Sequence, residues 1–440
     1  MSEERDALVV GGNMAGLAIA YLLGQYGYRT TLVEKAARLG GVDGSFVNGR
    51  GRSFDFGMHA LDHMRAEFVT KLLTHAVRGR VRRLPKRRAI VLRGHLIPYN
   101  APPSAWPAEL RALLSAGPIV DDLGSAPPTR AALGRIYGAA FAAMIFDEAL
   151  RSYPAECRHL DFGVDESALM VNVYPWFFPR VEREGRADDP HHRYQERVRR
   201  EQDEHVIYPE SGGFAGFAEG LAARAREAGV EILQGAGDLA FDMDPAARVV
   251  RSCTALGRTF SARRVYWCGP VGALCGLLGE EAPDVAPERF VLGSFQFARP
   301  VSCPYLELIV ADPAHPINRA SFPGKLHGEP DDLVQLEFAF PKASGAYGAG
   351  AEYWLETWLD SLRALGVVQR DNELVEFDLK SFPILYNSFG VDGQPMPELE
   401  LNALPPTSNL RPVLPTIRKV NINTRLPQYL EFLARDLARG

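Results

Sequence analysis

The 440-residue sequence lacks several features that would assign it to a familiar class of protein. It has only five cysteines, Cys157, Cys253, Cys268, Cys275 and Cys303. Their spacing fits neither a metal site nor a redox pair, so we expect reduced, mostly buried thiols. Basic residues are not in excess, because the net charge is −5 and the pI is about 6.1. This balance argues against nucleic acid as a partner.

Long apolar runs are missing too. No stretch of about 18 apolar residues occurs, so we expect no membrane span. The start, MSEERDALVV, lacks the basic region of a signal peptide, and repeats and low-complexity segments are absent. With 46% hydrophobic residues, the chain can still bury a large core. These properties predict a cytoplasmic protein with two domains.

The first sixty residues carry the strongest positive signal. An apolar run leads into the turn GGNMAG (Gly11–Gly16), a helix of small residues follows, and a second apolar run ends at Glu34. Gly11 permits the tight turn, and Gly16 lets the helix pack closely on the sheet with a pyrophosphate at its N-terminus. Glu34 stands where an acid can bond a ribose hydroxyl. The pattern predicts the βαβ entry of a dinucleotide-binding domain.

One position departs from the usual fingerprint. Asn13 stands where a second glycine normally lets the backbone approach the pyrophosphate. Because asparagine tolerates positive φ better than most residues, we expect the turn to survive with the phosphate slightly farther away. The alternative is a parallel α/β domain with a glycine turn and no cofactor. The predicted cofactor residues here are Gly11, Gly12, Asn13, Met14, Ala15, Gly16, Glu34, Lys35, Arg38, Gly40 and Gly41.

Farther along, the patterns predict a hairpin at Arg93-Gly94 and a helix over residues 131–150. A glycine turn, a helix and a strand are expected over residues 208–236. Three or four alternating strands over residues 290–340 indicate an antiparallel sheet. The C-terminal segment predicts a strand, a turn at Leu426-Pro427 and a closing helix. A helix is also expected over residues 353–365.

The signature VVGGNMAGL…LVEKAARLGG resembles that of the flavoprotein superfamily containing amine oxidases, phytoene desaturases, protoporphyrinogen oxidases and UDP-galactopyranose mutases. The resemblance implies FAD rather than NAD as cofactor. It implies an α/β fold class: a Rossmann-like FAD-binding domain, a parallel sheet with helices, plus a discontinuous α+β substrate domain with an antiparallel sheet. The expected FAD-binding domain comprises residues 1–70, 205–288 and 385–440, and the substrate-binding domain comprises residues 71–204 and 289–384.

Several pieces look most like a divergent UDP-galactopyranose mutase. FDFGMHAL is similar to the mutase's G-P-H motif and places His59 near the flavin. INRASFP is similar to its T-R-x-x-E strand, which makes Arg319 the expected ligand of a diphosphate. NTRLPQYLE is similar to its closing segment, which makes Arg425 and Tyr429 expected cofactor ligands. The aromatic segment that cradles uridine in the mutases has no match, so the nucleotide contacts do not carry over.

Further candidates rest on weaker signals. Arg180 and Tyr386 are catalytic candidates by their order along the chain, together with Arg319 and His59. The alternative for the arginines is an ordinary surface ion pair, and for His59 a core histidine. The aromatic run Trp176–Phe178 fits either an apolar pocket wall or packing between domains. No residue spacing indicates a metal site.

Two reaction classes remain open. In the mutase-like class, N5 of the reduced flavin attacks an anionic, nucleotide-linked sugar, and arginines neutralise the leaving diphosphate. In the oxidoreductase class, the oxidised flavin takes a hydride from a small molecule, as in amine oxidases and desaturases. A flavin-bound partner subunit with little catalysis of its own is a third interpretation. A homodimer is left open.

Overall fold

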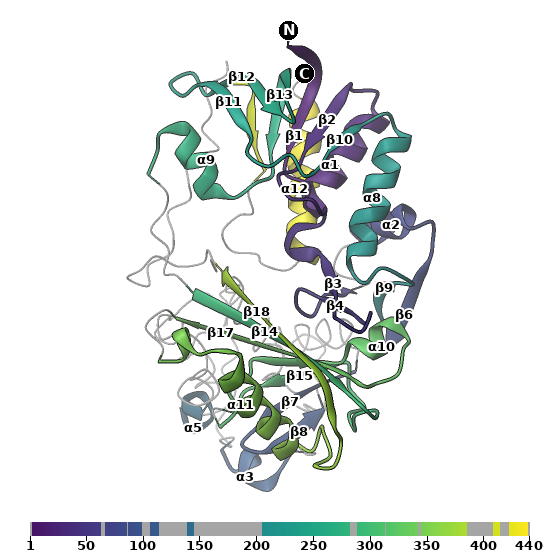
Figure 1. Cartoon of the computed structure of the whole chain (residues 1–440), viewed down its shortest axis with the longest axis vertical. Helices are drawn as coiled ribbons and strands as arrows, with labels where there is room; N and C mark the ends of the chain where they lie inside the picture. The colour runs from purple at the N-terminus through teal and green to yellow at the C-terminus, as the bar shows by residue number, and fades with distance from the viewer. Residues whose placement is uncertain are drawn as a thin grey trace, which may run out of the picture.

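The structure is a computed structural model, and it describes residues 2–62, 67–85, 87–98, 106–113, 139–144, 205–281, 288–312, 314–341, 345–384, 408–413 and 422–438. Figure 1 shows two halves, each built around one large sheet. Both chain termini lie in the half that holds the first sheet.

The first sheet has the strand order β10-β2-β1-β13-β12-β11, and β19 pairs with β13. Its strands are β1 (Glu3–Val10), β2 (Thr30–Val33), β10 (Glu231–Leu233), β11 (Ala240–Asp244), β12 (Val249–Ala255), β13 (Arg258–Trp267) and β19 (Leu410–Pro412). β1 runs parallel to β2 and β13, as do β10 to β2 and β19 to β13. Parallel strands covered on both faces are near-continuously apolar, which explains the runs ALVV and TTLV.

Helices cover both faces of this sheet (Figure 1). On one face, Ala7 and Val9 share a core with α1 (Met14–Gln25), α8 (Ala215–Glu227), α12 (Ile422–Ala438) and α2 (Glu67–Ala76). On the other, Leu8 and Val10 share a core with α9 (Val271–Leu278). The alternation along β1 therefore fixes the layers of this half.

The second sheet has the order β18-β14-β17-β16-β15-β7-β8, antiparallel except for β7 and β15. Its strands are β7 (Arg88–Leu92), β8 (His95–Pro98), β14 (Glu288–Phe297), β15 (Glu307–Val310), β16 (Arg319–Ser321), β17 (Leu333–Pro341) and β18 (Leu374–Ile384). One face packs on α11 (Ala351–Ala364) through the buried Trp354 and Trp358. The opposite face is the one that matters for the site.

Smaller elements complete the described part. They are the hairpin β3 (Ser45–Val47) and β4 (Ser53–Asp55), the three-stranded sheet of β5 (Leu61–Asp62), β9 (His205–Pro209) and β6 (Val81–Pro85), the helices α3 (Ala108–Arg111), α5 (Ala139–Ala143) and α10 (Pro323–His327), and the short 3-10 turns Gly41–Asp43 and Gly345–Gly348. The hairpin β3–β4 and the strand β9 lie between the two large sheets (Figure 1).

The expected fold class, a Rossmann-like parallel sheet with helices plus an antiparallel sheet, is confirmed. The hairpin at Arg93-Gly94 is confirmed as well, and both residues have positive φ, 48° and 73°. Strands of the first sheet lie within residues 3–33, 231–267 and 410–412, and those of the second within 88–98 and 288–384. The domain boundaries themselves stay a prediction. Of the helix expected over residues 131–150, only 139–144 is described.

The prediction for the C-terminal segment was wrong in part. Helix α12 begins at Ile422 and continues through Pro427, where we expected a strand and a turn. Pro427 lies near the N-terminus of the helix, so its missing N–H costs one bond. Burial of Leu426, Leu430 and Leu433 against the core offsets that cost. The four described cysteines, 253, 268, 275 and 303, are buried and without disulfides, as expected.

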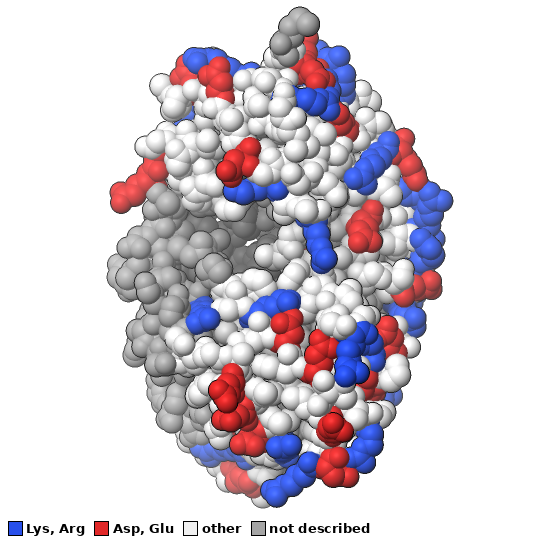
Figure 2. Space-filling view, viewed as in Figure 1, with Lys and Arg blue, Asp and Glu red and all other residues white. Residues whose placement is uncertain are grey.

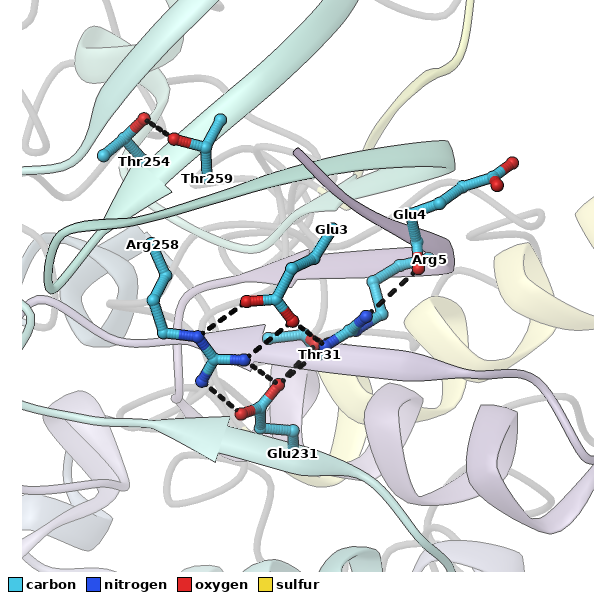
Figure 3. A network of polar contacts seen from close by, with 8 residues as sticks. All are labelled: Glu3, Glu4, Arg5, Thr31, Glu231, Thr254, Arg258 and Thr259. Carbon is cyan, nitrogen blue, oxygen red and sulfur yellow. Dashed lines mark hydrogen bonds and ion pairs between the residues drawn. The ribbon is translucent and has the colours of Figure 1, made fainter. Parts of the chain in front are cut away.

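A network of ion pairs crosses the end of the first sheet at which β1 begins (Figure 3). Arg258 bonds Glu3 at 2.8 Å and also Glu231, and Arg5 bonds the same two carboxylates at 2.8 and 3.0 Å. The hydrogen bond from Arg258 contributes most to lowering the pKa of Glu3 to about 2. The network links the N-terminal ends of β1, β10 and β13. Open α/β sheets bind ligands at the carboxyl ends of their strands, so the network lies at the other end of the sheet.

Candidate functional site

The turn after β1 is built so that only glycine fits at two positions. Gly11 has φ +107°, and a Cβ there would lie 3.0 Å from the backbone carbonyl of Cys268. A Cβ on Gly16 would lie 1.9 Å from the carbonyl oxygen of Gly11. The helix α1 therefore begins directly against the turn, which brings its N-terminal N–H groups to the carboxyl end of β1.

Asn13 works differently from our expectation. Its φ is −73°, so the position needs no left-handed conformation, which Gly11 supplies instead. Asn13 is the N-cap of α1: its Oδ1 accepts the N–H of Gly16 at 3.0 Å, and its Nδ2 donates to the carbonyl of Cys268 at 2.7 Å. The side chain thus occupies a donor that the phosphates of a bound dinucleotide would otherwise use.

Glu34 lies at the carboxyl end of β2 and closes over the same turn. One of its oxygens accepts the N–H of Gly12 at 2.5 Å and the other that of Ala36 at 2.7 Å. A Cβ on Gly12 would lie 2.6 Å from the side-chain end of Leu39 and 3.0 Å from Cβ of Glu34, so a larger residue there would make Leu39 move. A carboxylate has about four acceptor sites, so Glu34 keeps acceptor capacity for ribose hydroxyls.

The remaining predicted cofactor residues lie around this turn. Gly40 and Gly41 have φ of 104° and 59°, and Gly40 donates its N–H to the carbonyl of Gly12 at 2.9 Å. Met14 and Ala15 are buried in the first turn of α1. Lys35 and Arg38 are exposed, and Lys35 pairs with Asp238 at 2.7 Å. Their roles as cofactor ligands stay predictions.

A loop after β4 connects this domain to the second sheet. Met58 donates its N–H to Oε1 of the buried Glu337 on β17 at 2.6 Å. Gly57 has φ +121°, and a Cβ there would lie 3.5 Å from the same oxygen. The next residue, His59, lies with its ring 5.2 Å from that of Phe214, which precedes α8. The loop Gly57–His59 therefore bridges the predicted cofactor domain and the sheet.

Beneath that loop lies a buried chain of hydrogen bonds. Asp55 accepts from Ser45 Oγ at 2.6 Å, from the N–H of Phe214 at 2.9 Å and from the hydroxyl of Tyr208 at 2.7 Å. The same hydroxyl lies 2.8 Å from Nε2 of His327. Burial raises the pKa of Asp55 to about 6 and lowers the pKa of His327. The chain ties β4, β9 and α10 together.

The face of the second sheet that is turned away from α11 carries polar residues beside the apolar Phe290, Leu292 and Leu333. Cross-strand pairing places six polar residues in one row over six strands: Arg88, Glu307, Ser321, Gln335, Ser294 and Asp378. The next row contains Arg319 and Glu337 side by side. Gln335 donates to the carbonyl of Asp55 at 2.8 Å, so this face packs toward the predicted cofactor domain. The predicted substrate side of the fold is thus lined with hydrogen-bonding groups.

Arg319 lies on this face, and two glutamates surround its guanidinium. Its Nη2 bonds Oε2 of Glu337 at 2.6 Å, and its Nε lies 3.1 Å from both oxygens of that carboxylate. Nη1 lies 3.8 Å from Glu307, which in turn contacts Arg88. Glu307 and Glu337 are 2% and 4% exposed, so the charge of Arg319 is neutralised within the protein.

Other predicted site residues are placed apart or not described. Arg180 and Tyr386 lie outside the described residues, as does the aromatic run Trp176–Phe178. Arg425 lies in α12 without a described side chain. Tyr429 is buried in the core that α12 shares with α1.

Sequence reasoning missed Glu337, Asp55, Tyr208 and His327. The signal for Glu337 was the alternation of LVQLEFAF, in which Gln335 and Glu337 fall on one face. That pattern indicates a solvent-exposed face in an antiparallel sheet, whereas this face is covered by the rest of the protein. The alternation of SFDF (residues 53–56) likewise placed Asp55 on one face of the strand and the two phenylalanines on the other.

The residues at the turn fit a dinucleotide cofactor. Glycine is required where the chain must come close, an acid follows β2, and a helix N-terminus faces the same point. Figure 2 shows a hollow between the two halves, with Lys and Arg side chains on its described rim. Within the described residues, no group of three His, Cys, Asp or Glu side chains is arranged to hold a metal ion. Nor does any described helix combine the length and apolar character needed to cross a membrane.

Comparison with known proteins agrees with this geometry. The model of the NAD(P)-binding Rossmann-like domain matches residues 9–75. Reduced UDP-galactopyranose mutase is similar over 99% of this chain and 94% of its own, with a TM-score of 0.68 and 14% identity. A candidate protoporphyrinogen oxidase from Exiguobacterium (TM-score 0.65, 15% identity) and putrescine oxidase bound to putrescine (0.62, 13%) are similar over 100% of both chains.

No curated protein matches the sequence. At such identities, the similar structures establish the fold and leave the chemistry open. The chain therefore carries a dinucleotide-binding Rossmann domain and has the two-part fold of these enzymes.

Proposed function

We propose that this protein is an FAD-dependent enzyme that acts on a small molecule between its two sheets. The observation that carries the proposal is the turn after β1, where Gly11 and Gly16 cannot bear side chains and Glu34 closes over the helix N-terminus. The signature that continues through Gly40 and Gly41 is similar to that of FAD-binding proteins. The fold extends the similarity to all or nearly all of the chains of a candidate protoporphyrinogen oxidase, a putrescine oxidase and a mutase.

For the reaction, the charges on the sheet face favour a flavin oxidoreductase. Arg319, the residue expected to bind a diphosphate, is already paired with the buried carboxylate of Glu337. Removing one partner of a buried ion pair leaves an uncompensated charge, which is strongly unfavourable. A substrate without a diphosphate leaves this pair intact. We therefore infer oxidation of an uncharged or cationic small molecule, with the flavin as hydride acceptor.

The second candidate is the mutase-like rearrangement of an anionic, nucleotide-linked sugar. It is supported by the position of Arg319 on the sheet face that packs toward the predicted cofactor domain. It is also supported by the similarity to a mutase over nearly the whole chain. In this reaction the diphosphate of the substrate would have to compete with Glu337 for the guanidinium.

In either reaction, the flavin supplies the redox or nucleophilic chemistry and the chain supplies binding and orientation. The turn Gly11–Gly16 would hold the pyrophosphate and Glu34 would hold the ribose. Glu337 and Asp55 hold the backbone of the Gly57–His59 loop and of Phe214 through buried hydrogen bonds. Ile90 and Ile309, both buried beside the charged residues, keep water away from that face.

The test begins with the absorption spectrum of the purified protein after incubation with FAD. The loaded protein is then mixed with amines, alcohols and nucleotide sugars, with and without dithionite. Bleaching of the oxidised flavin by a substrate, with return of colour in air, supports the oxidoreductase. Product formation that requires reduced flavin and consumes no electrons supports the mutase-like reaction. A protein that binds no FAD refutes both.

A further inference from the structure

We propose that Glu337 is a positioning residue that fixes the Gly57–His59 loop, and that Arg319 serves the site by holding Glu337 in place. The inference rests on the proposed function, because this loop carries the histidine expected to contact the flavin. It assigns a role to a glutamate that the sequence motifs left unassigned. It also gives Arg319 a task other than binding the substrate.

Glu337 has both oxygens engaged. Oε1 accepts the N–H of Met58 at 2.6 Å and Nε of Arg319 at 3.1 Å, while Oε2 accepts Nη2 of Arg319 at 2.6 Å. The residue is 4% exposed, so water does not replace these partners. The carboxylate therefore joins the loop to the middle of the sheet through charge-assisted bonds.

The loop needs such an acceptor because its backbone is unusual. Gly57 adopts φ +121°, a conformation that L side chains rarely adopt, so the turn requires glycine for its backbone conformation. A buried N–H that lacks a partner is costly, and Met58 has its N–H buried at this point. One side-chain carboxylate thus satisfies the amide that the turn at Gly57 directs into the sheet.

Arg319 is held for this purpose by its neighbours. It is the direct cross-strand partner of Glu337, and Glu307 lies on its other side. Arg88 then contacts Glu307, so the charges alternate over the four adjacent strands β7, β15, β16 and β17. The four charges sum to zero. Releasing Arg319 to a substrate would leave the buried Glu337 without an arginine and Glu307 with Arg88 alone.

The chain offers a matched control. Arg52 bonds Asp332, just before β17, with both distances 2.8 Å, and Asp332 is 9% exposed. This pair also links the β3–β4 hairpin to the second sheet. It lies five residues before Glu337 and therefore about 16 Å along the strand. Asp332→Asn thus removes a comparable buried pair without touching the Gly57–His59 loop.

The test is hydrogen exchange of peptides covering residues 54–60, measured on the protein without and with FAD. In the unsubstituted protein, the Met58 amide should exchange slowly. In Glu337→Gln and in Arg319→Met it should exchange at least tenfold faster, since a charge-assisted bond is lost or weakened. Asp332→Asn should leave this peptide unchanged. With FAD bound, the visible circular dichroism of the flavin should differ from that of the unsubstituted protein in Glu337→Gln and in Arg319→Met. The change should have the same sign in both variants.

The double variant Glu337→Gln/Arg319→Met provides a second criterion. If the two residues act as a unit, it should exchange no faster than the worse single variant. Exchange like that of the unsubstituted protein in Arg319→Met would overturn the inference and leave Arg319 to the substrate. Fast exchange of Met58 in the unsubstituted protein would overturn it without any variant. Slow exchange of Met58 in a protein that binds no FAD would instead refute the proposed function alone.

Discussion

The buried carboxyl of Asp55 makes the stability of this protein depend on pH in an uncommon direction. Burial raises its pKa from the ordinary 3.8 to about 6, although the bonds from Ser45, Phe214 and Tyr208 act against this rise. An acid with a raised pKa in the folded state destabilises that state once it ionises. Stability should therefore be highest below pH 3.8 as far as this group is concerned, and should fall as the pH rises through 6.

The size of the effect follows from the pKa difference. The shift from 3.8 to about 6 corresponds to about 3 kcal/mol in the free energy of unfolding. About half of that change falls between pH 5 and pH 8, a range in which unfolding can be followed. The variant Asp55→Asn copies the protonated state, because its oxygen can accept from Ser45 and Phe214 while its amide donates to Tyr208.

The assay is urea unfolding of both proteins at several pH values. The stability of Asp55→Asn relative to the unsubstituted protein should rise by roughly 1.5 kcal/mol between pH 5 and pH 8. Subtracting the two curves removes the titration of the other groups. Asp332→Asn serves as the control, and its difference should not follow that course. A difference that is constant over the whole range for Asp55→Asn would refute the reasoning.

Three further outcomes are expected. Asn13→Gly should lower thermal stability only slightly, by a few tenths of a kcal/mol, and should tighten FAD binding severalfold in a titration, because the cap no longer occupies a backbone donor. Arg258→Met should lower the free energy of unfolding at neutral pH, and its difference from the unsubstituted protein should shrink in acid, since the stability from the lowered pKa of Glu3 is present above pH 4.5 and is lost as the pH falls toward 2. Gly293→Ala should cost about 1–3 kcal/mol in urea unfolding, because its Cβ would lie 2.3 Å from the ring of Trp358.

Local sequence signals were sufficient where one short segment contains the whole cause. The turn Gly11–Gly16 requires glycine for contacts within itself and with a neighbouring strand, and the sequence shows those glycines directly. The hairpin at Arg93-Gly94 and the strands over residues 290–340 follow from alternation in the same way. The role of Asn13 was missed because the fingerprint gives the residue type but not its φ.

The rest depends on contacts between distant segments. Glu337 meets Met58 over 279 positions, and Tyr208 meets Asp55 over 153. A period-two pattern indicates that Glu337 is on one face of a strand, but it does not indicate that another part of the protein covers that face. Likewise, the motif that marked Arg319 contains no information on Glu307 or Glu337. Pro427 was misread because the burial of its neighbours outweighs the local preference of proline.

The measurement that tests the central claim most directly is a titration of the purified protein with FAD, compared with the variant Glu34→Ala. We expect one FAD per chain and a dissociation constant that is about 10–100 times higher in the variant, since a charge-assisted bond to the ribose is lost. Asp6→Ala is the control, because Asp6 also accepts a backbone N–H, that of Arg29 at 2.9 Å, at the end of the loop between α1 and β2. The affinity of Asp6→Ala for FAD should equal that of the unsubstituted protein. Absence of FAD binding, or equal affinity in Glu34→Ala, would contradict the account.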